Sequence, residues 1–133
     1  MEKPIVVRFD HIALHVKDVS ASIQFYQNIL GLQLLPRPNF DFEGAWFLVG
    51  DREIHLIGNR IEKPLSGSRS NHFALQVHDL SDWEIWLQHQ KYPYRPPKAR
   101  PDGVRQIFLE DPDGYTIELA EKSSSIFLST PKS

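Results

Sequence analysis

The chain contains the same strand pattern twice, and this duplication restricts its fold more than any other feature. Residues 10–16 read DHIALHV, and residues 71–77 read NHFALQV. In each copy, apolar and polar residues alternate with a period of two, which is typical of a strand with one buried face. An Asp and a Ser follow each run and indicate the start of a helix. We therefore interpret the sequence as two copies of one folding unit.

Each copy is expected to continue with a helix. In the first copy, Ser20 is the expected N-cap, and Gly31 is expected to end the helix. In the second copy, Ser81 and Glu84 form an S-x-x-E capping box, and Pro93 is expected to close the helix. The pattern of one strand followed by one helix is thus predicted twice.

A hairpin is predicted after each helix. The first joins residues 45–49 to 53–57, and the second joins residues 106–109 to 115–120 through the turn DPDG. In this alignment Phe47 corresponds to Phe108, and His55 corresponds to Glu118. The predicted fold class is α+β, with two paired modules that each contain a strand, a helix and about three strands.

Length and composition are those of one globular domain. A chain of 133 residues falls in the commonest range for a single domain. We expect one domain, with module one at about 7–59, a linker at 60–70, module two at about 71–121 and a C-terminal tail at 122–133. Residues 92–103, rich in proline and cationic side chains, are expected to form a long surface loop.

The composition also excludes several kinds of partner. The formal net charge of −2 gives no electrostatic footprint for nucleic acid, and no window has the run of apolar residues that crosses a membrane. The sequence has no cysteine, so any metal must be held by nitrogen and oxygen ligands. We expect a cytoplasmic protein that binds neither nucleic acid nor membranes.

The face opposite the apolar one carries selected polar residues. His11, His55, His72 and Glu118 occupy corresponding positions of the two copies. Each is a good ligand for a divalent cation such as Zn, Ni, Mn, Fe or Co. A single histidine or glutamate on a strand is usually only hydrogen-bonded or solvated, but the correspondence in pairs favours a common role. If the two modules curve toward each other, the four side chains converge on one divalent metal.

The chain resembles the vicinal oxygen chelate superfamily. The resemblance rests on the order of the elements, on DHIALHVKDVSASIQFYQNILGLQLL and on the ending DPDGYTIELAE, and it covers about residues 7–121. This superfamily includes glyoxalase I, fosfomycin-resistance proteins, extradiol dioxygenases and bleomycin-binding proteins. The resemblance implies paired βαβββ modules that form a cupped mixed sheet around a central metal cavity, commonly in a homodimer.

Within the superfamily, the chain looks most like glyoxalase I. In that enzyme the metal ligands lie on the strands that here carry His11, His55, His72 and Glu118, and Asn59 matches an asparagine that contacts glutathione. The sequence departs from the pattern at two places. Glyoxalase I usually has Glu in place of His55, and it has a glutathione-binding arginine four residues after the first ligand, where this chain has a histidine.

The implied activity is that of a metal-dependent lyase or isomerase. Its substrate would be a small molecule, such as a thiol conjugate, bound through two neighbouring oxygens. Glu118 is the candidate base that removes the proton from the carbon between these oxygens. The alternatives are a fosfomycin-type transferase, an Fe(II) extradiol dioxygenase, and a metal-free binding protein of the bleomycin type.

Further residues are candidates for substrate contacts. His15 and Gln76 share corresponding positions on the polar face, although they can equally fill polar space there. Cationic residues near the expected mouth of the site are candidates for holding an anionic group: Arg37, Lys98, Arg100 and Arg105. Aromatic residues can either wall a pocket or belong to the core: Trp46, Phe47, Tyr94 and Phe108.

Overall fold

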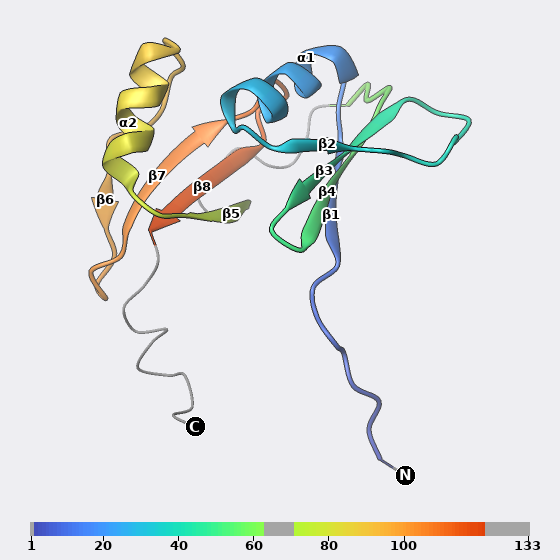
Figure 1. Ribbon diagram of the computed structural model, residues 1–133, viewed down its shortest axis with the longest axis horizontal. Coiled ribbons are helices and arrows are strands. Elements are labelled where there is room, and N and C mark those ends of the chain that lie inside the picture. Colours follow the sequence, from blue (N-terminus) through green and yellow to red (C-terminus); the bar gives the residue numbers. More distant parts are fainter. Residues whose placement is uncertain (1, 63–70, 122–133) are drawn as a thin grey trace. The chain divides into compact units, whose positions relative to one another are not determined.

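The computed structural model describes residues 2–62 and 71–121 (Figure 1). The chain divides into two compact units, Met1–Lys63 and Pro64–Ser133, and each contains one copy of the repeated pattern. We call them module one and module two. Most of the expected linker and the whole expected C-terminal tail lie outside the described residues.

Module one forms a four-stranded mixed sheet with one helical segment. The strand order is β1-β4-β3-β2, and β1 runs parallel to β4 while the other pairs are antiparallel. The helical segment ends before Gly31, which has the positive φ of 72° expected at a helix end. The elements are β1 (His11–His15), α1 (Val19–Gln24), the π-helical turn η1 (Phe25–Ile29), β2 (Gln33–Leu35), β3 (Gly44–Val49) and β4 (Arg52–Ile57).

Module two repeats this arrangement. Its strand order is β5-β8-β7-β6, with β5 parallel to β8 and the other pairs antiparallel. The elements are β5 (His72–Val77), α2 (Leu80–His89), β6 (Lys98–Ala99), β7 (Arg105–Glu110) and β8 (Thr116–Glu121). The short strand β6 lies within the segment that the sequence predicts as a loop. The α+β class and the paired βαβββ modules are confirmed.

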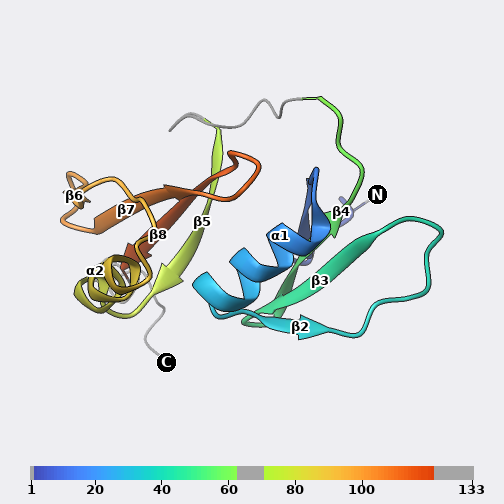
Figure 2. The ribbon, with the colours of Figure 1, turned by 90° about the horizontal axis from the view of Figure 1, so that it is seen from above.

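The helix of each module packs on the apolar face of its sheet (Figure 2). In module one α1 contacts β3 and β4, and in module two α2 contacts β7 and β8. The strand side chains on this face are at most 2% exposed in the centre of each sheet. They include Phe47, Ile54 and Leu56 in module one and Ile107, Ile117 and Leu119 in module two. The alternation in the sequence therefore separates core from surface as predicted.

The helices begin at residues other than the predicted ones. Asp18, not Ser20, caps α1, because its carboxylate accepts a hydrogen bond from the backbone N–H of Ala21 at 3.2 Å. Asp79, not Ser81, caps α2 and accepts a bond from the N–H of Ser81 at 2.8 Å. Each Asp is the last extended residue before its helix, so its side chain reaches the first helical N–H groups.

The expected capping box and end of the second helix are also wrong. Glu84 accepts a hydrogen bond from the Tyr94 hydroxyl at 3.2 Å instead of closing a capping box. The helix ends at His89, before Pro93, and Lys91 then turns the chain with a φ of 54°. A left-handed residue is a common way to leave a helix, and a proline is not needed for it.

The strand register corrects one expected correspondence. Trp46 lies opposite His55 in module one, and Phe108 lies opposite Glu118 in module two. The counterpart of Phe108 is therefore Trp46 and not Phe47. Because residues opposite each other across a ladder share one face of the sheet, Phe47 belongs to the core face, where its side chain is 0% exposed.

None of the helices in the described parts of the chain is long and apolar enough to cross a membrane.

Candidate metal centre

His11 and His55 come together on one face of module one. His11 lies opposite Glu53, and His55 lies opposite Ala13, so the two histidines occupy a diagonal across the parallel pair β1 and β4. Their imidazole rings stack with a centroid distance of 4.0 Å and an interplanar angle of 21°. The strand register therefore brings the two predicted donors of this module into contact.

A carboxylate contacts each of these imidazoles. Asp10 Oδ2 lies 2.7 Å from His11 Nδ1, and Glu53 Oε1 lies 2.7 Å from His55 Nε2. The hydrogen bond with His11 holds the pKa of the Asp10 carboxyl below its ordinary value. Carboxylates in such positions orient metal-binding histidines through the ring nitrogen that does not bind the metal. In this arrangement His11 would present Nε2 to a metal, and His55 would present Nδ1.

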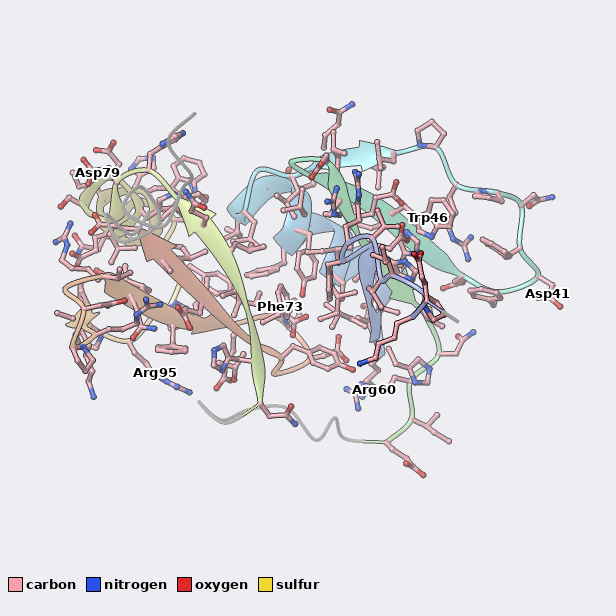
Figure 3. All side chains as sticks on the ribbon, turned by 90° about the horizontal axis from the view of Figure 1, so that it is seen from below. Asp41, Trp46, Arg60, Phe73, Asp79 and Arg95 are labelled. Atoms are coloured by element: carbon pink, nitrogen blue, oxygen red, sulfur yellow. The ribbon has the colours of Figure 1, made fainter. Side chains whose placement is uncertain are left out.

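Trp46 completes a stack of three rings in module one. Its ring lies parallel to that of His55, with a centroid distance of 4.1 Å and an interplanar angle of 5°. The stack runs from Trp46 on β3 through His55 on β4 to His11 on β1, and Figure 3 labels Trp46 within its module. Trp46 therefore supports His55 directly.

His72 and Glu118 form the corresponding pair in module two. His72 lies opposite Thr116, and Glu118 lies opposite Ala74, which is the same diagonal as in module one. His72 Nε2 is 3.0 Å from Glu118 Oε1. The Glu118 side chain is only 7% exposed, against 26% for His72. This pair is thus a nearly buried carboxylate in contact with an imidazole.

Gln106 holds the second oxygen of the Glu118 carboxylate. Its side-chain amide donates a hydrogen bond to Glu118 Oε2 at 2.8 Å. The sequence pattern alone does not single out this residue. The available signal was its position two residues before Phe108, which places both side chains on the same face of β7. Gln106 fixes the orientation of Glu118 and leaves Oε1 directed toward His72.

The chemistry of these side chains fits a divalent cation. A buried carboxylate is costly unless a positive charge or hydrogen-bond donors compensate it, and imidazole nitrogen with carboxylate oxygen is a common ligand set for Zn, Mn, Fe, Co and Ni. Within residues 2–62 and 71–121, no three His, Asp or Glu side chains form a ready metal cluster. Each module supplies one pair of candidate donors.

Two of the predicted substrate contacts have local explanations. His15 Nε2 lies 3.0 Å from the carbonyl oxygen of Gly58, so this side chain ties β1 to the end of β4. Asn59 has a φ of 66°, a conformation that asparagine tolerates better than most residues. Gln76 is exposed. It lies on β5 four residues after His72, and therefore on the same face of the strand.

Arg37 is engaged within its own loop. Its Nη2 donates to the carbonyl oxygen of Phe42 at 2.9 Å, and its Cζ lies 4.8 Å from the ring centroid of Phe40 and 4.9 Å from that of Phe42. These contacts hold the connection between β2 and β3.

Two of the predicted cations in module two are paired with carboxylates. Arg100 pairs with Asp102, and Arg105 donates to both oxygens of Glu121 at 2.9 and 2.7 Å. The hydrogen bonds from Arg105 and from the backbone N–H of Leu80 keep the pKa of Glu121 below its ordinary value. This network joins β7 and β8 to the start of α2.

Module two has a hollow of about 570 Å³ beside β7. The segment before β6 forms one wall with Tyr92, Tyr94 and Arg95, and β7 forms the other with Phe108 and Glu110. Tyr94 and Phe108, for which the sequence left a pocket wall or the core open, both border this hollow.

Tyr92 makes the stability of module two sensitive to alkaline pH. Burial, and then the charges of Asp111 and Glu110, raise the pKa of the Tyr92 phenol from 10.0 to about 12. The unfolded chain ionises first, so this contribution to stability is complete below pH 10 and is lost as the pH rises toward about 12. We expect the wild-type urea midpoint to fall more over this interval than that of Tyr92→Phe. Parallel declines in the two proteins would contradict the assignment.

Comparison with known proteins shows which family the chain resembles. Residues 8–119 match the model of the Glyoxalase/Bleomycin resistance protein/Dioxygenase superfamily. The chain is 33% identical over 129 residues to a lactoylglutathione lyase from Neisseria meningitidis, covering 89% of this chain and 93% of that one. It is 29% identical over 123 residues to the metallothiol transferase FosB from Staphylococcus epidermidis, covering 86% and 81% of the two chains.

The fold is also shared with solved structures. A putative glyoxalase family protein from Bacillus anthracis is 25% identical, has a TM-score of 0.76 and is matched over 91% of this chain and 99% of that one. The fosfomycin resistance protein FosX from Listeria monocytogenes has the same fold, with a TM-score of 0.74 at 22% identity and coverage of 91% and 98%. With a family match that spans both modules, the chain belongs to the glyoxalase/bleomycin resistance protein/dioxygenase superfamily.

Proposed function

We propose that this protein is a metal-dependent enzyme of glyoxalase I type, a lyase or isomerase that binds a small substrate through two neighbouring oxygens. The observation that carries the proposal is the arrangement around Glu118, a nearly buried carboxylate whose two oxygens are held by His72 and Gln106. A relative named lactoylglutathione lyase, at 33% identity, and one named probable lactoylglutathione lyase, at 35% identity, support the reaction class.

The proposed ligands of one divalent metal, Zn, Ni, Mn, Fe or Co, are His11, His55, His72 and Glu118. Since each module holds two of them, a complete set needs donors from both modules, either of one chain or of two chains in a homodimer. Asp10 and Glu53 contact the ring nitrogens of His11 and His55 that would not bind the metal. When bound, the metal would act as a Lewis acid that stabilises negative charge developing on a substrate oxygen.

The chain's own residues have distinct proposed roles in the reaction. Glu118 accepts the substrate proton at one carboxylate oxygen while the amide of Gln106 holds the other oxygen in place. Trp46 keeps His55 in position through ring stacking. The proposed substrate contacts are His15, Arg37, Trp46, Asn59 and Gln76. We propose a cytoplasmic location for the enzyme.

The test is reconstitution of the chelator-treated protein with each metal in turn. We expect stoichiometric binding of at least one metal, and conversion of the hemithioacetal of methylglyoxal and glutathione, or of a related thiol, by the reconstituted protein. Glu118→Gln should abolish turnover. A protein that binds no metal from the series, or that binds it and converts none of these hemithioacetals, would refute the proposal.

A second candidate function is supported by the FosB relatives. A fosfomycin-type transferase would add a thiol to fosfomycin and would use the same donor pairs. The reconstituted protein should therefore also be assayed for fosfomycin inactivation with several thiols. Oxygen uptake with catechols tests the dioxygenase alternative, and ligand binding by the metal-free protein tests the binding-protein alternative.

A further inference from the structure

We propose that the hollow beside β7 binds a small aromatic carboxylate, with Arg95 holding the carboxylate group. The biological role of this site rests on the proposed function, because the bound carboxylate would represent the class of substrate for the site on β5 and β8. The binding itself does not depend on a metal and can be measured without one.

The aromatic walls of the hollow are fixed in place. The Tyr92 hydroxyl donates to the carbonyl oxygen of Glu110 at 2.5 Å. The Tyr94 hydroxyl donates to Glu84 Oε2 at 3.2 Å and accepts a hydrogen bond from the Gln88 side chain at 2.7 Å. Both polar ends are thus satisfied by the protein, which leaves the rings to pack against an apolar group. Preformed aromatic surfaces of this kind are typical of small-molecule sites.

Phe108 joins the hollow to the candidate metal centre. It lies directly opposite Glu118 in the β7–β8 ladder. Its ring meets that of His72 edge to face, with centroids 5.3 Å apart and an interplanar angle of 85°. Phe108 therefore borders both the hollow and the His72–Glu118 pair.

Arg95 supplies a cation that is held loosely. Its backbone N–H donates to the carbonyl oxygen of Phe108 at 2.8 Å, which fixes the position of its main chain. Its guanidinium lies 6.0 Å from the Phe108 ring centroid and makes one long contact of 3.3 Å with Glu110. The side chains of Arg95 and Glu110 are 44% and 49% exposed, and in Figure 3 the Arg95 side chain projects away from the ribbon.

Because this ion pair is loose, a ligand carboxylate can displace Glu110 from Arg95. Arg105, by comparison, makes two contacts below 3 Å with one carboxylate. The contact of Arg95 is with a carboxylate oxygen, so a ligand carboxylate can replace Glu110 in the same role, and a planar guanidinium can bind it through two parallel hydrogen bonds.

Of the two acidic residues at the hollow, one is engaged in a turn. Asp111 is 4% exposed, and its Oδ1 accepts hydrogen bonds from the backbone N–H groups of Asp113 and Tyr115, both at 2.9 Å. Its carboxylate is therefore used inside the DPDG turn. Glu110 is the one competitor that contacts Arg95 among the described residues.

The experiment compares phenylacetate with its neutral analogue phenylacetamide by isothermal titration calorimetry, using the full chain with and without metal. We expect Arg95→Gln to weaken phenylacetate binding by about tenfold or more, because a charge-assisted hydrogen bond is lost. Arg95→Lys should retain part of the affinity. Glu110→Gln should strengthen phenylacetate binding, since it removes the competing carboxylate. Phenylacetamide binding should change in none of the three.

Arg52→Gln is the matched control, because Arg52 is a cation of module one that pairs with Asp51. Equal phenylacetate affinity in the wild type and Arg95→Gln, or no binding of phenylacetate by the wild type, would overturn the inference. The two proposals fail separately. If the protein binds no metal but Arg95→Gln still weakens phenylacetate binding, only the metal centre is refuted. If the protein binds metal but Arg95→Gln leaves phenylacetate affinity unchanged, only the carboxylate subsite is refuted.

Discussion

Replacing His72 with alanine is expected to lower the affinity for a divalent metal by more than about 100-fold, which exceeds the effect usual for residues that only orient a ligand. The substitution removes one donor and leaves the nearly buried Glu118 carboxylate without its imidazole partner. Gln106→Leu should lower metal affinity by about 10- to 100-fold, because it removes the hydrogen bond that orients Glu118 but no donor. Competition with a chromophoric chelator measures both affinities.

Two surface substitutions serve as matched controls for this series. His89 lies at the end of α2 and Gln33 lies on β2, and both are exposed. His89→Ala and Gln33→Leu should leave metal affinity unchanged. An affinity in His72→Ala equal to that of His89→Ala would show that the donor pair of module two does not bind the metal. Circular dichroism of all four variants separates a loss of binding from a loss of folding.

Phe47→Ala is expected to destabilise the protein by about 3–5 kcal/mol. The Phe47 side chain is 0% exposed, and its ring lies 5.8 Å, between centroids, from that of Tyr26 in the core beneath α1. Truncation therefore removes a large apolar group from a closely packed layer and leaves a cavity. Urea unfolding followed by far-UV circular dichroism measures the change in the free energy of unfolding.

The control for this substitution is Phe9→Ala. Phe9 is 67% exposed, so its truncation should change the free energy of unfolding by no more than about 0.5 kcal/mol. A similar loss of stability in the two variants would contradict the register, which assigns Phe47 to the core face and Trp46 to the opposite face.

The sheets could be predicted from the sequence because alternation is a local signal. The period of two in residues 10–16 and 71–77 predicts which side chains face the core. In the structure Leu14 and Val16 are buried, and Phe73, Leu75 and Val77 are half-buried between exposed neighbours. The correspondence of Trp46 with Phe108 was not predicted, because the register of a hairpin depends on the length and geometry of its connection. A single shift of one residue exchanges the two faces of a strand.

The contacts around the candidate metal centre were less predictable, since they depend on neighbours across strands. Gln106 reaches Glu118 from the adjacent strand, and its position on the face of Phe108 does not by itself identify this partner. Trp46 was proposed as a pocket wall, yet its stacking on His55 follows only from the pairing of β3 with β4. The helix caps were missed for a different reason. Asp and Ser are both good N-caps, and the choice between them depends on the last extended residue of the strand.

The two donor pairs occupy the same diagonal in two separately hydrogen-bonded sheets, and this has an evolutionary consequence. The backbone that sets the spacing of His11 and His55 belongs wholly to module one, and that of His72 and Glu118 belongs wholly to module two. A duplicated ancestor with this arrangement can change the chemistry of one half while the other half keeps its geometry. If the proposed ligand set holds, exchange of the side chain at position 55 would alter the donors of module one and leave the backbone of module two unchanged.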